Sequence, residues 1–158
     1  MIRPARPDEL EALRDLERDA GRAFAAIGMG EIARDEPPPA AELARAWVAT
    51  DERDEPVAYV LSSIVDGCAH IDQVSVAPAH ARRGLGAALI EHLAEGARAD
   101  GRPGLTLTTF RDVPWNAPYY ERLGFRAFEP GPELAAIVAE EARRIPGDAP
   151  RVAMRRPL

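Results

Sequence analysis

The sequence between residues 76 and 90 decides the fold, and it reads Val76-Ala77-Pro78-Ala79-His80-Ala81-Arg82-Arg83-Gly84-Leu85-Gly86-Ala87-Ala88-Leu89-Ile90. A β-branched run from Ile71 to Val76 predicts a strand, and the apolar spacing after Gly84 predicts a helix. Glycines let a backbone approach a ligand closely, and the first N–H groups of a helix have no partner inside it. The helix dipole also favours negative charge at that end. The stretch therefore predicts a strand, a basic turn and a helix that bind an anion such as a pyrophosphate.

Two better-known phosphate motifs are excluded for this stretch. A Walker A loop needs a lysine, and the chain contains none. The dinucleotide fingerprint needs a third Gly or an Ala three residues after its second glycine, whereas Leu89 stands at that distance from Gly86. A tight strand-to-helix turn that binds no ligand stays open as the alternative.

Length and composition narrow the class of protein. The 158 residues, of which 46% are hydrophobic, fit one domain over residues 1–158. A single cysteine, Cys68, excludes an intrachain disulfide and suits the cytoplasm. The sequence shows no signal peptide and no apolar run of transmembrane length, so we expect a cytoplasmic protein with no membrane partner. The net charge of −6 argues against nucleic-acid binding, and the spacing of histidines, cysteine and carboxylates predicts no metal site.

Hydrophobic periodicity and turn signals predict alternating helices and strands. The dipeptide Asp66-Gly67 between two apolar runs predicts a hairpin. The predicted strands cover residues 2–5, 47–50, 56–65, 68–76, 105–110, 125–129 and 151–155. The predicted helices cover residues 7–20, 40–47, 84–99, 115–123 and 132–145. Residues 21–39 are predicted as a loop, with a short helix inside it as an open alternative. Such a mixture predicts an α/β fold with helices layered on one mixed sheet.

A second motif follows the predicted strand over residues 105–110, and it reads Asn116-Ala117-Pro118-Tyr119-Tyr120-Glu121-Arg122-Leu123-Gly124-Phe125. Together with Val76-x-Pro78 and Arg83-Gly84-Leu85-Gly86-Ala87, it resembles the GNAT superfamily of N-acetyltransferases, which use acetyl-CoA. The resemblance extends over about residues 1–156. One departure is Ala81, which stands where the family usually has Gln or Arg to help hold the pyrophosphate.

The resemblance implies a particular α/β fold and a particular co-substrate. The fold is a single mixed, mostly antiparallel twisted sheet of six or seven strands, with helices on both faces and splayed central strands. Acetyl-CoA is the co-substrate and no metal takes part. The acceptor is an amine on a small molecule or a peptide, with a small cationic amine favoured, and the resemblance allows a homodimer.

The resemblance also implies which residues hold the co-substrate. Backbone N–H groups and side chains of the turn contact the pyrophosphate, and these residues are Arg82, Arg83, Gly84, Leu85, Gly86, Ala87 and Ala88. The pantetheine arm lies along the strand at Val74 and Val76, and an N–H near Val74 polarises the thioester carbonyl. Asn116 orients the co-substrate or, as an equally open alternative, caps the short helix that follows.

Acetyl transfer to an amine needs both a base and an acid, because an ammonium must lose a proton and the leaving thiolate gains one. Tyr120 occupies the family's general-acid position, with a partly buried core tyrosine as the alternative. For the base, the first choice is Asp72, acting directly or through a water, and His70 is the alternative. The acceptor site is implied between residues 21–39 and 131–150. A CoA-binding sensor without catalysis and a partner-binding domain remain open as other functions.

Overall fold

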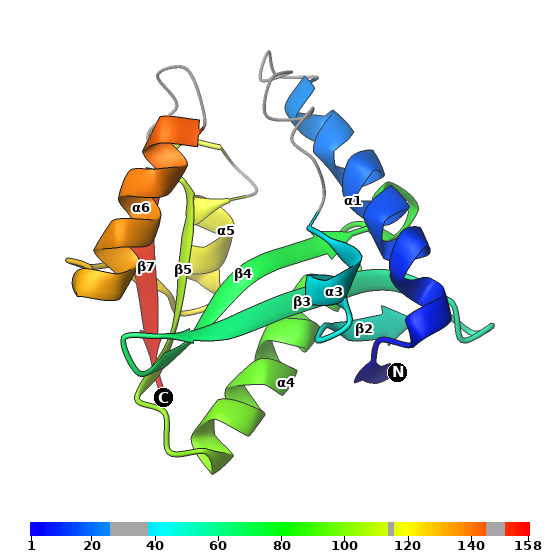
Figure 1. Cartoon of the computed structure of the whole chain (residues 1–158), viewed down its shortest axis with the longest axis horizontal. Helices are drawn as coiled ribbons and strands as arrows, with labels where there is room; N and C mark the ends of the chain where they lie inside the picture. The colour runs from blue at the N-terminus through cyan, green and yellow to red at the C-terminus, as the bar shows by residue number, and fades with distance from the viewer. Residues whose placement is uncertain (26–37, 114–115, 145–150) are drawn as a thin grey trace. The chain divides into compact units, whose positions relative to one another are not determined.

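The computed structural model describes residues 1–25, 38–113, 116–144 and 151–158, with only the backbone for residues 21–25 (Figure 1). Its seven strands form one sheet in the order β1-β2-β3-β4-β5-β7-β6. The strands are β1 (Ile2–Pro4), β2 (Trp47–Thr50), β3 (Pro56–Val65), β4 (Cys68–Val76), β5 (Gly104–Phe110), β6 (Arg126–Ala127) and β7 (Arg151–Pro157). The helices are α1 (Leu10–Ala25), α3 (Ala40–Leu43), α4 (Leu85–Ala99), α5 (Ala117–Arg122) and α6 (Pro132–Arg144), with the 3-10 turns η1 (Pro7–Glu9) and η2 (Pro78–His80).

Strand directions agree with the predicted mixed sheet. β4 pairs with β5 in parallel, whereas β1 with β2, β2 with β3, β5 with β7 and β6 with β7 are antiparallel. The prediction of one mixed, mostly antiparallel sheet is therefore confirmed. The splay of the central strands stays a prediction.

The chain forms two compact units. The first contains Met1–Ser62 and Asp72–His92, and the second contains Ser63–Ile71 and Leu93–Leu158. β3, β4 and α4 each contribute residues to both units. The single domain over residues 1–158 and the homodimer stay predictions.

In the first unit, helices pack on both faces of the sheet. Val48 of β2 lies in a buried cluster with Leu13 of α1. Its neighbour Trp47 meets the His92 ring of α4 edge-on, with the ring centroids 4.4 Å apart. Successive side chains of a strand point to opposite faces. The helices α1 and α4 therefore cover opposite faces of the sheet in this unit.

The core of the first unit forms where the apolar stripe of α1 meets β2, β3 and α3. Its buried members are Leu13, Leu16, Leu43, Ala46, Val48, Tyr59 and Leu61. The predicted end of this helix near Ala20 is wrong, since α1 continues to Ala25. Gly21 costs the helix about 1 kcal/mol relative to alanine, but Arg22 and Ala23 are good helix formers. One glycine is therefore not enough to end the helix.

A charged network fixes the start of the chain. The Arg3 guanidinium contacts the Glu9 carboxylate at 2.8 Å and the Asp54 carboxylate at 3.0 Å. Glu9 also accepts a hydrogen bond from the Arg6 backbone N–H (2.9 Å), which caps η1. The side chains of Arg3 and Glu9 are only 10% and 12% exposed, so this pair is shielded from solvent. Hydrogen bonding from Arg3 lowers the pKa of Glu9 below its ordinary value.

This network predicts a specific loss of stability in acid. Because the folded pKa of Glu9 is depressed, its stabilisation is complete above the ordinary value of 4.5 and is lost as the pH falls through the folded pKa. We expect Glu9→Gln to melt below wild type at pH 7 and the difference to shrink below pH ~4. Thermal melts of both proteins from pH 7 to pH 3 measure this. A difference that persists unchanged at pH 3 would contradict the expectation.

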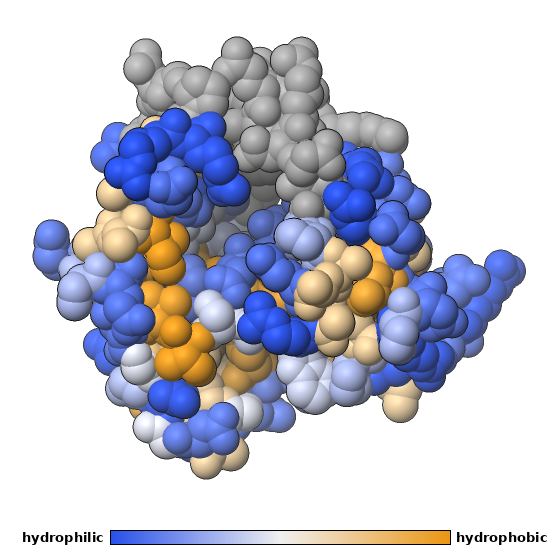
Figure 2. Space-filling model, in the orientation of Figure 1, coloured by the Kyte–Doolittle hydropathy of each residue, from blue (hydrophilic) through white to orange (hydrophobic). Residues whose placement is uncertain are grey.

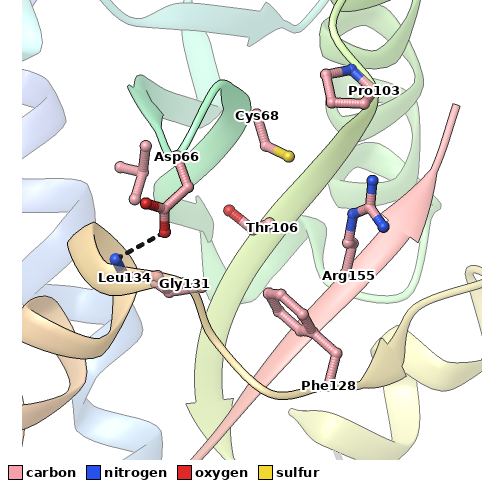
Figure 3. Close-up of a pocket in the computed structure, with 9 residues that line it drawn as sticks. Asp66, Cys68, Pro103, Thr106, Phe128, Gly131, Leu134 and Arg155 are labelled. Carbon is pink, nitrogen blue, oxygen red and sulfur yellow. Dashed lines mark hydrogen bonds between the residues drawn. The ribbon is translucent and has the colours of Figure 1, made fainter.

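In the second unit, one aspartate joins the hairpin to a helix. Asp66 and Gly67 have φ of 51° and 79° between β3 and β4, which confirms the predicted hairpin turn. The Asp66 carboxylate accepts from the backbone N–H groups of Glu133 and Leu134, each at 3.0 Å, and thereby caps α6 (Figure 3). Leu134 then packs in a buried cluster with Val65 and Ala153.

The strands at the end of the chain differ in length from the prediction. β6 covers only Arg126–Ala127, whereas β7 extends to Pro157 and pairs with all of β5 from Gly104 to Phe110. β6 is an edge strand, and β7 lies between β5 and β6.

At the C-terminal end of α6, where Arg143 and Arg144 lie, Figure 2 shows hydrophilic residues on the surface.

Candidate active site

The second half of β4 presents two chemically different faces. Gln73 and Ser75 both contact the carboxylate of Glu17 on α1. Because side chains alternate along a strand, Asp72, Val74 and Val76 belong to the opposite face. Asp72 is exposed, and the two valines are half-buried.

The turn after η2 has the backbone that the sequence predicts for an anion site. Arg82 and Gly84 adopt φ of 64° and 76°, a conformation that costs most residues about 1–2 kcal/mol. Within the described part of the chain, no protein acceptor is recorded for the backbone N–H groups of residues 82–87. The Ala88 N–H donates to the Gly84 carbonyl at 2.9 Å, so the available donors end at Ala87. The side chains of Arg82 and Arg83 are exposed beside these donors.

Gly84 in the turn and Gly96 within α4 provide a matched pair of substitutions that tests the backbone conformation of the turn. A Cβ at Gly84 would meet no atom within 4 Å, so the positive φ rather than space requires glycine there. We expect Gly84→Ala to lower the free energy of unfolding by about 1 kcal/mol. Gly96→Ala, in open space within the helix, is expected to raise it by up to about 1 kcal/mol. Urea unfolding measures both changes, and a stabilised Gly84→Ala would contradict the assignment.

A pocket of about 490 Å³ lies next to this turn and includes Arg83 and Leu85. The Nδ1 atom of His80, another lining residue, is buried and has no hydrogen-bond partner among the described residues. Asp51 and Glu52 also line the pocket together with Arg53 and Arg83, so its acidic and basic side chains balance and favour neither an anion nor a cation. We therefore leave this pocket unassigned.

In the second unit, Tyr120 lies on α5 in an aromatic cluster. Its ring meets those of Tyr119 and Phe125 edge-on, with centroids 5.2 Å and 5.9 Å away. The side chain is largely buried, and no hydrogen bond of its hydroxyl is recorded among the described residues. Burial, aided by Tyr119, raises the pKa of Tyr120 above its ordinary value. The phenol is therefore protonated at neutral pH and has a proton to give.

Asn116 stands at the N-cap position of α5 but does not cap that helix with its side chain. Its Oδ1 instead accepts a hydrogen bond from Thr109 of β5 at 2.7 Å. Its Nδ2 is buried with no partner among the described residues. An unpaired buried donor costs about 1–3 kcal/mol. The predicted capping role of this side chain is wrong.

The alternative base, His70, is a core residue of the second unit. It is buried on β4, and its Nδ1 lies 2.9 Å from Thr106 Oγ1 on β5. Burial lowers the pKa of His70 below its ordinary value. The ring is therefore neutral at pH 7, but its burial and its hydrogen bond suit a structural role.

A second pocket, of about 190 Å³, lies in the second unit and contains Asp66, Cys68, Thr106 and Arg155 (Figure 3). The Asp66 carboxylate is already used by the N-terminus of α6, and Thr106 is paired with His70. Cys68 is buried. Asp66 and Thr106 of this pocket thus already serve the fold.

Sequence reasoning missed one functional candidate, Glu17. This residue follows Leu10 and Leu13 at helical spacing, on the stripe of α1 that faces the sheet. It accepts hydrogen bonds from Tyr59, Gln73 and Ser75. Burial raises its pKa above the ordinary value, and these three hydrogen bonds act in the opposite direction. A carboxylate on a core-facing helical stripe was the signal that could have revealed it.

Comparison with known proteins establishes the family. A family model described as "Acetyltransferase (GNAT) family" matches residues 10–125, which is more than half of the chain. The chain belongs to the acetyltransferase (GNAT) family. The match covers α1, the basic turn before α4 and the Tyr120 motif of this GNAT acetyltransferase.

Solved structures share the fold of this GNAT protein. The ribosomal-protein-S18-alanine N-acetyltransferase from Escherichia coli is 21% identical with a TM-score of 0.68, covering 99% of this chain and 92% of that chain. The PaiA N-acetyltransferase from Thermoplasma acidophilum, solved with coenzyme A, is 14% identical with a TM-score of 0.75, covering 100% and 98%. A GNAT acetyltransferase from Brucella melitensis, solved with acetyl-CoA, is 23% identical with a TM-score of 0.56, covering 84% and 89%.

The described residues bear on the predictions for the membrane, for a metal and for the acceptor site. None of the described helices of this GNAT protein has the length and apolar character needed to cross a bilayer. Within the described residues, no group of three or more His, Cys, Asp or Glu side chains is placed to hold a metal ion. Residues 26–37 and 145–150, in the two segments predicted to hold the acceptor, lie outside the described residues.

Proposed function

We propose that this acetyltransferase moves an acetyl group from acetyl-CoA to a primary amine by direct transfer in a ternary complex. The observation that carries the proposal is the run of available backbone donors over residues 82–87, placed beside two exposed arginines at the start of α4. Such donors bind a pyrophosphate through both hydrogen bonds and the helix dipole. Acetyl-CoA supplies the acetyl group as a thioester.

Three groups of residues are proposed to hold the co-substrate. Residues 82–87 take the pyrophosphate, and the exposed guanidiniums of Arg82 and Arg83 offset the missing Gln or Arg at Ala81. The half-buried stretch of β4 with Val74 and Val76 receives the pantetheine arm, and the Val74 N–H polarises the thioester carbonyl. Asn116 contributes its Nδ2, which is buried and has no partner among the described residues, as a hydrogen-bond donor.

Tyr120 is proposed as the general acid for the leaving thiolate. The phenol is protonated at neutral pH, as a general acid must be before the thiolate forms, although burial raises its pKa and makes it a weaker acid. Asp72, exposed on β4, is the base that the sequence suggests. Direct transfer is favoured because Cys68, the only cysteine, is buried and is poorly placed to carry the acetyl group.

The acceptor is proposed to be a primary amine on a small molecule or a peptide. The E. coli protein with this fold is described as acting on a protein's alanine, so an N-terminal alanine peptide belongs among the test acceptors together with a lysine peptide and a polyamine. The chain's own net charge of −6 favours a cationic acceptor.

Two measurements test the proposal. Acetyl-CoA at millimolar concentration is expected to raise the melting temperature, because a ligand of the folded state stabilises it. Thiol release from acetyl-CoA is then expected to depend on at least one of these amines. Binding without amine-dependent thiol release would support the CoA sensor instead, and no thermal shift would favour a partner-binding domain.

A further inference from the structure

We infer that Glu17 of α1, rather than Asp72 of β4, binds the ammonium group of the acceptor and takes its proton. This inference rests on the proposed function, and it assigns the base of that reaction. It stands on a hydrogen-bonded carboxylate that lies entirely within the first unit.

The Glu17 carboxylate is held in one position by three neutral donors. Tyr59 Oη donates to Oε2 at 2.8 Å, and Ser75 Oγ donates to the same oxygen. Gln73 Nε2 donates to Oε1 at 3.0 Å and also to Ser75 Oγ at 3.1 Å. Tyr59 and Ser75 are themselves buried in the sheet. The donors come from β3 and β4, so the sheet fixes the orientation of a side chain that belongs to a helix.

This arrangement leaves one acceptor position open. An ionised carboxylate has about four lone-pair positions. Among the described residues, two donors occupy Oε2 and one occupies Oε1. Glu17 as a whole is half-buried rather than fully enclosed among the described residues. The open position on Oε1 suits one N–H of an ammonium group.

The carboxylate also lies at the level of β4 where the reaction is proposed to occur. Its partners Gln73 and Ser75 flank Val74, whose N–H is proposed to polarise the thioester carbonyl. Consecutive residues of a strand are about 3.3 Å apart along the strand. Along the strand, a base anchored at positions 73 and 75 is therefore within one residue of the proposed oxyanion donor. That donor is a backbone N–H, which lies in the plane of the sheet and not on the opposite face to which the Val74 side chain belongs.

The charged surroundings favour a cation at this position. β3 contributes Tyr59, whose pKa is raised by burial and then by the charge of Glu17. β4 contributes two side chains that do not titrate, and the residue of α3 in this core is Leu43. On α1 itself, Arg14 and Arg18 are paired with Glu11 and Asp15. Among the described residues, the hydrogen-bond partners of Glu17 include no cation, which suits binding of an ammonium group.

The proposed step balances in protons and bonds. The ammonium nitrogen passes one proton to the Glu17 carboxylate and then forms a C–N bond with the acetyl carbon. The C–S bond breaks, and its electron pair remains on sulfur. The nitrogen loses its second proton, and sulfur gains one from the Tyr120 hydroxyl, which is restored by that second proton. Glu17 returns its own proton to water.

Three variants separate this role from the alternatives. We expect Glu17→Gln to lower kcat/KM for the reactive amine about 100-fold or more at pH 7, and to remove the acidic limb of its pH profile. Asp72→Asn is expected to cause a smaller loss and to keep that limb. Asp15→Asn removes an exposed charge from the same helix and is the control expected to resemble wild type. Hydroxylamine, largely unprotonated at pH 7, should lose much less rate in Glu17→Gln than an alkylamine does.

The melting temperature separates chemistry from folding. Because the pKa of Glu17 is raised, its ionised form costs stability above pH ~4.5, and Glu17→Gln is expected to melt at or above wild type at pH 7. Equal kcat/KM in Glu17→Gln and wild type, with a large loss in Asp72→Asn, would overturn the inference and leave the proposed function standing. A wild type that acetyl-CoA does not stabilise would instead remove the proposed function.

A binding test covers the case in which acetyl-CoA binds but no amine reacts. Propylammonium chloride is compared with sodium chloride at equal ionic strength, with acetyl-CoA present. We expect the ammonium to raise the melting temperature of wild type more than that of Glu17→Gln. Equal shifts in the two proteins would overturn the inference.

Discussion

Tyr120→Phe is expected to lower kcat for amine-dependent thiol release about 100-fold or more, the scale of a lost general acid. The ring keeps its edge-on contacts with Tyr119 and Phe125, so the aromatic cluster should be preserved. The hydroxyl has no recorded partner among the described residues, and its removal should change the free energy of unfolding by about 1 kcal/mol or less. Calorimetry with acetyl-CoA is expected to give a dissociation constant close to that of wild type.

Tyr119→Phe is the matched control, because it removes the same group from the neighbouring ring. Tyr119 is less buried than Tyr120, and its ring lies 5.8 Å from the Arg122 guanidinium. We expect this variant to retain most of the turnover. Similar losses in the two variants would show that a general effect on α5, and not proton donation by Tyr120, causes the change.

Leu13→Ala is expected to have the largest effect on stability, a loss of about 2–5 kcal/mol in the free energy of unfolding. Leu13 is completely buried and packs with Leu43, Val48 and Tyr59. Such a loss is a large part of the 5–15 kcal/mol typical of a whole domain. Urea unfolding measures the change. The midpoint should fall with little change in slope, since the surface exposed on unfolding is nearly the same.

Leu10→Ala is the control on the same face of α1. Leu10 is only partly buried and packs at the edge of the same cluster. Its truncation removes the same atoms but leaves a site that solvent reaches, so the loss should be clearly smaller. Equal losses at the two positions would contradict the burial of Leu13. Glu17 follows Leu13 by one helical turn. Leu13→Ala therefore also tests whether the packing of α1 in this core positions the Glu17 carboxylate.

Much of the fold could be predicted because local sequence and global structure agree. Turn chemistry placed the hairpin at Asp66-Gly67, and apolar spacing placed the helix that follows the basic turn. These signals act over a few residues, so periodicity and turn rules detect them.

The candidate site was less predictable because its contacts join distant segments. Glu17 meets Gln73 and Ser75 across more than fifty residues. Capping of α5 by the Asn116 side chain was one of two open alternatives, but Thr109 engages its oxygen. His70 looked available on its strand, yet the pairing of β4 with β5 buries it against Thr106. Spacing along the chain carries no information on such partners.

Asp66 both forms the hairpin turn and caps α6, and these two roles limit which residues position 66 can accept. Glycine would suit the left-handed turn but would lose both carboxylate contacts to α6, whereas glutamate would place its charge too far out for the same geometry. A methyl group at Gly131 would come within 2.8 Å of the Asp66 carboxylate. Evolutionary drift at either site is therefore constrained by the other, and relatives that lose the acid at 66 should be the ones that admit bulk at 131.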